Sequence, residues 1–189
     1  AYLAWKVLPG IEARTGATFE SVPCLLGGVF KATGNQPPMQ ANANIPAKMA
    51  YEMLEMRRFI ARHGLTRFQM NPHFPVNTLL VMRIAVAAQR GGLLAQLLPA
   101  FFAAMWEDGK KMDDPAVVGE TLASAGLPAE RLLAAASEPE VKAALIANTE
   151  GAVARGVFGL PAFFVGDEMW FGKDRLRDVE EALAAARRP

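Results

Sequence analysis

The chain has 189 residues, of which 52% are apolar and 21% are charged, and its formal net charge is +1. This length suits one domain, or one domain with an insertion, and the apolar content is enough for a sizeable core. A net charge so close to zero produces no long-range field that would gather nucleic acid or an anionic membrane, so we expect neither as a partner.

The N-terminus shows no basic and apolar targeting segment. The longest apolar stretch, Leu93 to Trp106, is interrupted by Gln96 and Pro99. It is also shorter than the roughly 20 residues that a membrane-spanning helix needs. We therefore expect a cytoplasmic protein that does not enter a membrane.

The first predicted element is a helix over Tyr2 to Arg14, which has apolar residues at helical spacing and Gly16 as a stop signal. The segment from Ala17 to Pro23 alternates around Phe19 between apolar and polar residues, which predicts a short strand. Leu25 to Pro38 is punctuated by glycine and proline and is predicted to be a loop, with a helical turn near Val29 to Thr33. Gln40 to Asn44 is small and polar, which is typical of a mobile loop tip.

A block of predicted helices follows, and proline or glycine marks most of their ends. The expected ranges are Pro46 to His63, Asn77 to Gln89, Leu93 to Glu107, Asp114 to Ala125, Pro128 to Ser137 and Pro139 to Arg155. No repeat of fixed period relates these helices to one another. We expect residues 46–155 to be an all-helical insertion within a domain made of residues 1–45 and 156–189.

The last part of the chain predicts a hairpin and a closing helix. Its strands are expected at Ala162 to Val165 and Met169 to Phe171, joined by a turn at Gly166-Asp167-Glu168. Arg175 to Arg187 then has the pattern of an amphipathic helix.

Pro161 stands at the start of the first of these strands, one of the few places where a sheet tolerates proline. The bond between a residue and a following proline adopts the cis form at a cost of only about 0.5 to 1 kcal/mol. A cis Leu160–Pro161 bond would leave the backbone N–H and C=O of Leu160 free to pair with an extended peptide.

Cys24 is the one cysteine of the chain. Disulfide exchange by thioredoxin-like oxidoreductases uses a Cys-x-x-Cys pair, so dithiol redox catalysis is excluded. Cys24 follows Pro23 at the end of the predicted strand, and we expect a buried apolar residue rather than a reactive thiol. Any thiol chemistry would then depend on a thiol that a ligand brings.

The two histidines, His63 and His73, have no cysteine or carboxylate at a spacing that makes a metal site, so no metal is expected. His63, beside Gly64, is expected to be the last residue of a helix. His73 could line an active site, and Asn77 could be either a helix cap or a substrate contact.

Four segments together resemble the 2-hydroxychromene-2-carboxylate isomerases and their relatives, the kappa-class glutathione transferases. These segments are Tyr2-Leu3-Ala4, LGGVFKATGNQPP from Leu26 to Pro38, Pro46-Ala47-Lys48, and GVFGLPAFFVGDEMWFGKDR from Gly156 to Arg175. The resemblance runs from the first residue to about Leu183. It implies an α/β, thioredoxin-like (DsbA-like) fold with a large all-helical insertion, glutathione as the cofactor, and a homodimer.

In such a fold a strand precedes the first helix, and that strand is missing from this chain. We therefore expect the chain to be an N-terminally truncated piece of a longer protein. The serine that poises the glutathione thiol in the family lies directly before the Tyr-Leu that opens this helix, so it is expected upstream of Ala1. No catalytic residue is assigned here, and Ser21 is not a candidate because it belongs to the next predicted element.

The resemblance also implies which residues hold glutathione. Leu160 would pair with its cysteinyl part through the backbone, and Lys48 would meet a carboxylate. The stretch Phe171-Gly172-Lys173-Asp174 would hold the glutamyl end, with Asp174 facing its amino group. Lys173 departs from the small polar residue often found at this position. Asn35 would contact the organic substrate or glutathione.

Each of these residues also has a structural interpretation. Asn35 could bond its own backbone in a turn, and Lys48 could be a solvated surface residue. Asp174 could cap the final helix. Trp170 and Phe171 could wall an apolar pocket for an aromatic substrate, or they could belong to the strand core.

The resemblance implies a glutathione-dependent isomerase that converts 2-hydroxychromene-2-carboxylate to trans-o-hydroxybenzylidenepyruvate, or a similar reaction in aromatic-compound breakdown. A glutathione transferase or peroxidase of the kappa type is the alternative within the same family. A third possibility is a thioredoxin-like binding protein without catalysis. An isomerase regenerates its thiol, whereas a transferase consumes one thiol in each turnover.

Overall fold

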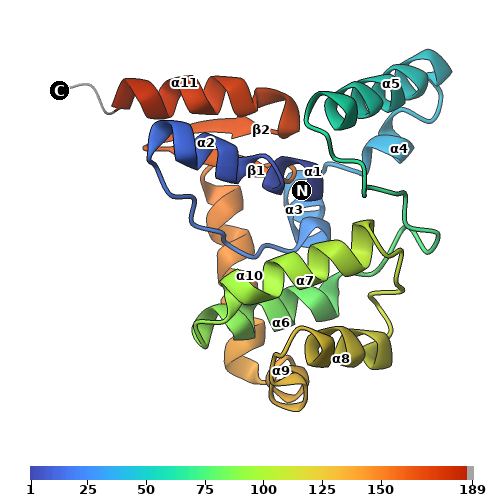
Figure 1. Cartoon of the computed structure of the whole chain (residues 1–189), viewed down its shortest axis with the longest axis vertical. Helices are drawn as coiled ribbons and strands as arrows, with labels where there is room; N and C mark the ends of the chain where they lie inside the picture. Colours follow the sequence, from blue (N-terminus) through green and yellow to red (C-terminus); the bar gives the residue numbers. More distant parts are fainter. Residues whose placement is uncertain (187–189) are drawn as a thin grey trace. The chain divides into compact units, whose positions relative to one another are not determined.

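The computed structural model describes residues 1–186, which form many helices and one small sheet (Figure 1). The sheet consists of β1 (Ala162–Val165) and β2 (Glu168–Phe171). The α-helices are α1 (Tyr2–Trp5), α2 (Leu8–Thr15), α3 (Leu26–Thr33), α4 (Pro38–Ala41), α5 (Pro46–Arg62), α6 (Leu79–Arg90), α7 (Leu94–Trp106), α8 (Pro115–Ser124), α9 (Ala129–Ala135), α10 (Pro139–Ala154) and α11 (Leu176–Ala186), and a short 3₁₀ helix, η1 (Lys173–Arg175), precedes α11.

These elements group into two compact units. The first contains Ala1–Ser21, Val29–Thr66 and the chain from Ala152 onward, and the second contains Val22–Gly28 and Arg67–Gly151. The boundaries fall within α3 and α10, and α5 groups with the hairpin rather than with the helices that follow it. The range expected for the insertion, residues 46–155, is free of strands in the structure. The domain boundaries at 45 and 156 stay a prediction.

The predicted single helix from Tyr2 to Arg14 is wrong, because the structure has two helices there, α1 and α2. Pro9 lies in the first turn of α2 and explains the break. Proline has no N–H to donate, and its ring conflicts with the carbonyl four residues earlier, which is that of Trp5. The predicted stop is confirmed, since Gly16 takes a left-handed conformation with φ of 62° and its N–H donates to the Glu12 carbonyl at 2.6 Å.

The predicted hairpin is confirmed. β1 and β2 are antiparallel, with Ala162 opposite Phe171 and Val165 opposite Glu168. The turn between them has two residues, of which Gly166 takes a φ of 59° that suits glycine at the start of a tight hairpin turn. The bond between Leu160 and Pro161 is cis, as expected, and so is the bond between Phe74 and Pro75.

The predicted strand from Ala17 to Pro23 is wrong, because this segment has no regular secondary structure. Within residues 1–186, β1 and β2 pair only with each other, so the segment has no backbone ladder to join. Its apolar residue Phe19 still packs edge-on against Phe163 of β1, with ring centroids 6.2 Å apart. The alternating pattern therefore predicted correctly that Phe19 packs against the hairpin, but predicted wrongly that the segment pairs as a strand.

The helical turn predicted near Val29 to Thr33 is present, but it is part of a longer, two-turn helix, α3, that begins at Leu26 despite two glycines near its start. One of these, Gly28, is explained by packing in the second unit, because a Cβ at this position would lie 3.0 Å from Cγ2 of Thr149. The Thr149 hydroxyl also accepts a hydrogen bond from the Leu25 N–H at 3.1 Å. The predicted loop tip from Gln40 to Asn44 is likewise partly helical, because α4 reaches Ala41.

The six helices predicted between Pro46 and Arg155 are all present, as α5 to α10. His63 is the C-cap residue of α5, as expected. Asp114 caps α8, where its carboxylate accepts a hydrogen bond from the Ala116 N–H at 3.0 Å. The Asn77 side chain accepts a hydrogen bond from the Leu79 N–H at 3.0 Å. Asn77 therefore bonds the first residue of α6, although Thr78 is the N-cap residue of this helix. None of the helices within residues 1–186 combines the length and apolar character needed to cross a membrane.

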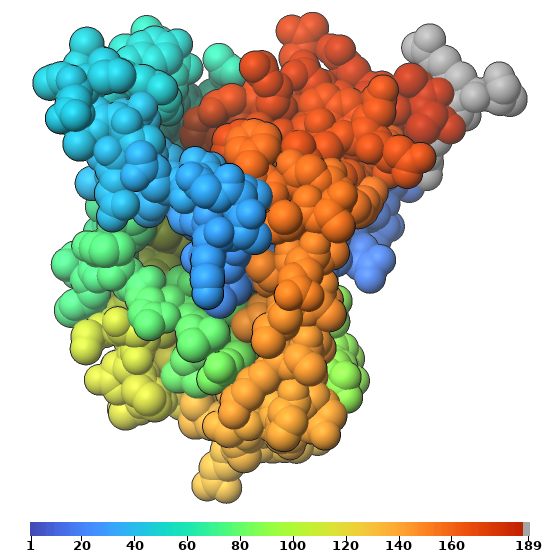
Figure 2. Space-filling model, turned by 180° about the vertical axis from the view of Figure 1, so that it is seen from behind, coloured from blue at the N-terminus to red at the C-terminus, as the bar shows by residue number. Residues whose placement is uncertain are grey.

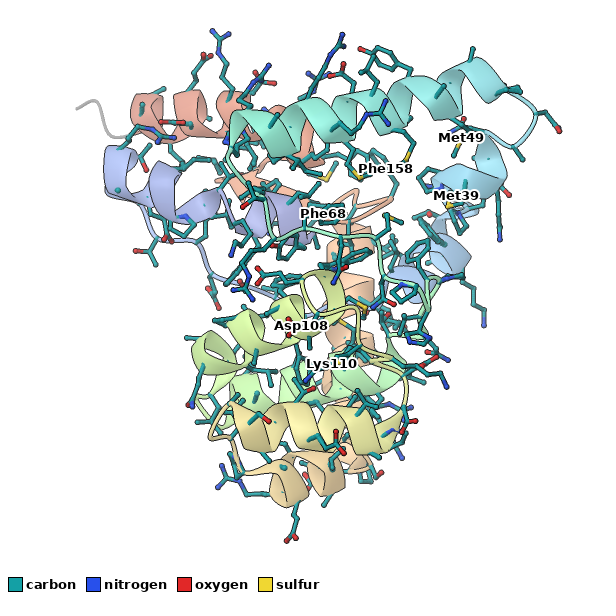
Figure 3. All side chains as sticks on the ribbon, turned by 45° about the vertical axis from the view of Figure 1, so that its right-hand side comes forward. Met39, Met49, Phe68, Asp108, Lys110 and Phe158 are labelled. Atoms are coloured by element: carbon teal, nitrogen blue, oxygen red, sulfur yellow. The ribbon has the colours of Figure 1, made fainter. Side chains whose placement is uncertain are left out.

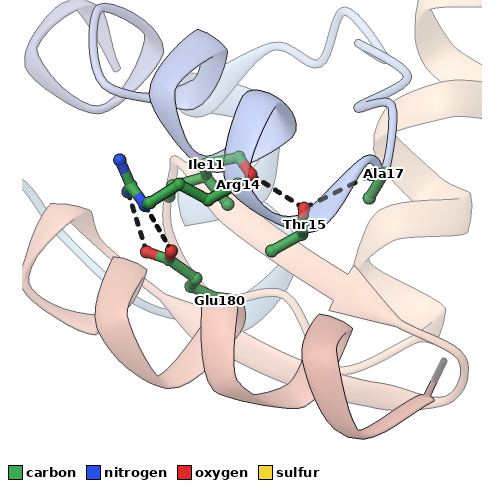
Figure 4. A network of polar contacts seen from close by, with 5 residues as sticks. All are labelled: Ile11, Arg14, Thr15, Ala17 and Glu180. Carbon is green, nitrogen blue, oxygen red and sulfur yellow. Dashed lines mark hydrogen bonds and ion pairs between the residues drawn. The ribbon is translucent and has the colours of Figure 1, made fainter. Parts of the chain in front are cut away.

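An ion pair joins α2 and α11 in the first unit (Figure 4). Nε and Nη2 of Arg14 donate to the two carboxylate oxygens of Glu180, at 2.5 and 2.9 Å. At the last residue of α2 the Thr15 hydroxyl donates to the Ile11 carbonyl at 2.8 Å and accepts from the Ala17 N–H at 3.3 Å. The hydrogen bond from Arg14 lowers the pKa of Glu180, and the positive charge of Arg14 adds to this effect.

We predict that this ion pair contributes stability at neutral pH and loses that contribution on acidification. Because the pKa of Glu180 is lower in the folded state, the contribution is complete above the unfolded value of about 4.3 and disappears as pH falls through the folded value. Arg14 is largely exposed and Glu180 is partly exposed, so the effect is small. The melting temperature of Glu180→Gln should lie about 2 °C below that of the wild type at pH 6, with the gap closing near pH 3. A gap that is the same at both pH values would contradict this account.

The second unit has an extended apolar core formed by α6 to α10. Ile84, Leu97, Val118 and Leu122 are fully inaccessible to solvent within it. The side chain of Asn71 is a buried polar group of this unit, and it bonds backbone groups on both sides of the turn that follows α7. This turn is therefore held by a buried side chain in addition to its backbone hydrogen bonds.

Candidate functional site

The residues predicted to bind glutathione all lie in the first unit, so their geometry can be described within one compact body. Leu160 precedes β1 and is half-buried. The carbonyl of its neighbour, Pro161, accepts a hydrogen bond from the Gly172 N–H at 2.9 Å, which closes the end of the hairpin ladder. Within residues 1–186 the backbone N–H and C=O of Leu160 have no hydrogen-bond partner. They form a short free edge beside the sheet.

Asn35 is bound to the segment that carries this edge. Its side-chain Nδ2 donates to the Phe158 carbonyl at 2.8 Å, and its Oδ1 accepts from the Gln36 N–H at 2.8 Å. Figure 2 shows the blue surface of residues 30–40 against the orange surface of the chain near residue 160, in agreement with this bond. Asn35 therefore positions the chain two residues before Leu160, and it also makes the local backbone bond of the turn interpretation.

Two aromatic side chains lie beside the edge. The rings of Phe158 and Phe171 are in contact, with centroids 4.7 Å apart and planes tilted by 47°. Gly159 allows this packing, because a Cβ there would lie 2.8 Å from Cε2 of Phe171. In Figure 3 Phe158 lies on the lower side of α5, as do Met39 and Met49.

The stretch after β2 brings two opposite charges together. Gly172 takes a φ of 85°, a conformation that side chains rarely adopt, and turns the chain into η1. The ammonium group of Lys173 pairs with the Asp174 carboxylate and lies 5.1 Å from the centre of the Phe59 ring of α5. The Lys173 side chain is only 19% exposed, whereas that of Asp174 is 63% exposed. The interpretation of Asp174 as a helix cap is not supported, because it lies within η1, whose N-cap is Gly172.

Lys48 is exposed in the first turn of α5 and makes no ion pair within residues 1–186. Eleven residues separate it from Phe59 along this helix, which corresponds to about 16 Å at a rise of 1.5 Å per residue. The structure therefore does not bring Lys48 to the Lys173–Asp174 pair. Lys48 and this ion pair could contact one ligand only at its opposite ends.

Cys24 is buried, as expected, and its Sγ lies 3.5 Å from the Asn148 carbonyl. Burial raises the pKa of its thiol, which disfavours the reactive thiolate. Within residues 1–186 no three His, Cys, Asp or Glu side chains are grouped in a way that could hold a metal ion.

We predict that Cys24 reacts severalfold more slowly than free cysteine with an aromatic disulfide reagent at pH 8, because its thiol is both buried and harder to ionise. The measurement is the absorbance of the released thiolate in native protein, with the urea-unfolded protein as the control. Equal rates in the native and unfolded protein would show that Cys24 is a reactive thiol.

A cavity of about 260 Å³ lies elsewhere in the first unit, lined by Lys6, Val7, Gly10, Arg14 and His63. Arg14 is already paired with Glu180. The pKa of His63 is lowered, mainly by burial and then by the charges of Arg62 and Arg14. None of the lining residues belongs to the predicted glutathione contacts.

The structure thus links most of the predicted residues through direct contacts. Asn35 bonds Phe158, Phe158 packs on Phe171, and the next residues are Gly172, Lys173 and Asp174. Phe59, Phe158 and Gly159 were not among the residues predicted for the site from the sequence. Phe158 and Gly159 stand inside the GVFGLP segment, where the alternation of glycine with large apolar residues was a usable signal.

Comparison with known proteins identifies the family to which this arrangement belongs. The family model of the DSBA-like thioredoxin domain matches residues 1–184, so the chain belongs to this family. Its fold is therefore the DsbA-like thioredoxin fold, mostly helical with a small two-stranded sheet, and the expected fold class is confirmed. The solved structure of a 2-hydroxychromene-2-carboxylate isomerase superposes with a TM-score of 0.82 at 24% identity, over 98% of this chain and 89% of that one.

The related enzymes agree with the resemblance found in the sequence. The chain is 30% identical to the 2-hydroxychromene-2-carboxylate isomerase of Pseudomonas putida, over 97% of this chain and 88% of that protein. It is 27% identical to glutathione S-transferase kappa 1 of Homo sapiens, over 97% of this chain and 85% of that protein. The expected kinship with both groups is confirmed, and the relatives of this chain are isomerases and glutathione transferases.

Proposed function

We propose that the protein is a glutathione-dependent cis–trans isomerase that converts 2-hydroxychromene-2-carboxylate to trans-o-hydroxybenzylidenepyruvate, or acts on a similar intermediate of aromatic breakdown. The observation that carries the proposal is the free backbone edge at Leu160, placed beside the charged pair of Lys173 and Asp174. The names of the relatives supply the reaction. We also propose that the protein acts in the cytoplasm as a homodimer.

The chemical groups of this site fit glutathione. The edge at Leu160 offers one N–H donor and one C=O acceptor, which are the groups that an extended peptide pairs with. The exposed carboxylate of Asp174 suits the α-amino group at the glutamyl end, and the ammonium of Lys173 beside it suits the α-carboxylate there. An adjacent pair of opposite charges is the complement of an amino acid zwitterion.

Lys48 and Asp174 would define the two ends of the ligand. An extended tripeptide spans about 10 Å, and the long Lys48 side chain covers part of the remaining distance along α5. Lys48 would then bind the glycyl carboxylate while Asp174 binds the glutamyl amino group. Leu160 would hold the cysteinyl residue between them. Asn35 would act through the Phe158 carbonyl, by holding this segment in place.

Bound glutathione would supply a thiol that adds to the conjugated double bond of the substrate and leaves after rotation, with no net redox change. The contribution of the residues named here is binding and orientation, which lowers the entropy cost of bringing two reactants together. No residue of this chain is assigned to remove the thiol proton.

A glutathione transferase of the kappa type is the second candidate, and the similarity to the human enzyme favours it. Both functions need the same tripeptide site, so they are separated by stoichiometry. We expect the absorbance of 2-hydroxychromene-2-carboxylate to change on addition of protein only when glutathione is present, with the free thiol concentration constant throughout. Loss of one thiol per substrate converted would establish the transferase. Turnover without glutathione, or no turnover, would overturn the isomerase proposal.

A further inference from the structure

The cavity lined by Lys6, Val7, Gly10, Arg14 and His63 has no place in the proposed function. Its volume is about 260 Å³, and all five residues belong to the first unit. Three of the five side chains end in basic nitrogen groups, and none of the five is acidic. A cavity with this lining attracts anions.

The guanidinium of Arg14 has donors left for a ligand. Glu180 accepts hydrogen bonds from its Nε and Nη2, which are the two dashed lines between these residues in Figure 4. The third nitrogen, Nη1, lies next to Gly10, where a Cβ would be 3.3 Å from it. Within residues 1–186 this Nη1 has no hydrogen-bond partner. Its two N–H groups are therefore available at the wall of the cavity.

His63 adds a group whose charge depends on pH. Its ring packs on that of Phe59, with centroids 4.4 Å apart, and its nitrogens make no hydrogen bond in the part of the chain that the structure describes. The pKa of His63 is lowered by burial, and then by the charges of Arg62 and Arg14. Both of these charges are positive, so an anion bound beside His63 would favour its protonated form.

The charged groups around His63 come from four helices. Arg62 is its neighbour on α5, Arg14 belongs to α2, and Lys6 is the C-cap residue of α1. Glu180 of α11 is paired with Arg14. Donors on three separate elements suit an anion with several acceptor oxygens. A phosphate or sulfate group offers three or four such oxygens, whereas a carboxylate offers two.

We propose that this cavity binds a small tetrahedral dianion, a phosphate or sulfate group, between Lys6, Arg14 and His63. None of these three residues belongs to the proposed glutathione contacts, so the inference does not rest on the proposed function. The Phe59 ring contacts both His63 and the Lys173 ammonium, which makes the two sites neighbours. The test must therefore separate one site from the other.

Sulfate is the probe, because it keeps two negative charges between pH 5.5 and pH 8 and any pH dependence then comes from the protein. The chain has two histidines, so NMR follows one ring signal from each, and His63→Gln assigns them. Sulfate replaces chloride at constant ionic strength. We expect it to raise the pKa of His63 and to leave that of His73, in the second unit, unchanged. Isothermal titration should show about fivefold tighter sulfate binding at pH 5.5 than at pH 8.

His63→Gln should remove this pH dependence, whereas His73→Gln, the same change in the second unit, should retain it. If sulfate shifts both histidines equally, or neither, the cavity does not bind anions and the proposal is wrong. Displacement of sulfate by S-methylglutathione would also contradict a separate site, because the cavity would then be part of the glutathione site. Inorganic phosphate and glycerol phosphate are compared at pH 8. Tighter binding of the ester would support an organic phosphate as the ligand, and tighter binding of inorganic phosphate would support the free anion.

Discussion

Replacing Asp174 by Asn is expected to weaken glutathione binding about tenfold, which corresponds to about 1.4 kcal/mol. The substitution keeps the size of the side chain and removes the charge that would face the glutamyl amino group. Hydrogen bonds to charged groups contribute about 1.5 to 3 kcal/mol, and the 63% exposure of this side chain places the effect at the lower end. Isothermal titration of the wild type and the variant measures the ratio directly.

Asp167→Asn is the control for this substitution. It makes the same change of net charge in the exposed hairpin turn, where no ion pair is formed within residues 1–186, so glutathione affinity should not change. Tighter binding by Asp174→Asn would show that Asp174 acts mainly to neutralise Lys173, and that Lys173 is the dominant contact. Equal affinities in all three proteins would remove Asp174 from the site.

Replacing Asn71 by Ala is expected to lower the free energy of unfolding by about 3 kcal/mol. The side chain is 4% exposed, and its Nδ2 donates to the carbonyls of Met105 and Lys110, at 2.8 Å each. Its Oδ1 accepts a hydrogen bond from the His73 N–H at 2.8 Å. Alanine would leave these three backbone groups without their partner in a buried position, which is costly.

Gln96→Ala provides the comparison, because Gln96 makes a similar bond from its amide to the Ala125 carbonyl at 2.9 Å but is exposed. Water can replace that bond, so the loss should stay below about 1 kcal/mol. Urea unfolding followed by circular dichroism gives both values. If the two variants lose the same stability, burial of the Asn71 network is not what matters.

Proline and glycine made much of the fold predictable from the sequence. Pro46, Pro115 and Pro139 each mark the start of a helix, and Gly16 and Gly166 mark a helix end and a hairpin turn. These residues act through local backbone geometry, which needs no knowledge of the rest of the molecule. The same reasoning applied to Pro9 would have predicted the break between α1 and α2.

The predictions of secondary structure were wrong where residues far away in the sequence determine the local conformation. The segment from Ala17 to Pro23 has the alternation of a strand, yet strand pairing depends on whether a neighbouring ladder is free. The helix α3 forms despite Gly27 and Gly28, and Gly28 is required by the approach of Thr149, more than a hundred residues away. The local propensity of a segment predicts neither the availability of a partner strand nor the approach of a distant side chain.

The candidate site likewise has features that could be predicted from the sequence and features that could not. The cis bond before Pro161 and the exposed carboxylate of Asp174 could be expected from a short segment. The contacts of Asn35 with Phe158 and of Lys173 with Phe59 join residues more than 100 positions apart, and the contact of Phe158 with Phe171 spans the hairpin. These contacts turn a set of separate residues into one continuous surface, and only the folded structure reveals them.

Titration of glutathione into the protein tests the central proposal most directly. We expect saturable binding with one site per chain and a dissociation constant of about 1 mM or lower, a binding free energy of at least about 4 kcal/mol in magnitude. Competition by S-methylglutathione at the same site would place the tripeptide, rather than the thiol alone, in the contacts described. The absence of binding heat at several times this concentration, in a protein that unfolds cooperatively, would contradict both the isomerase and the transferase.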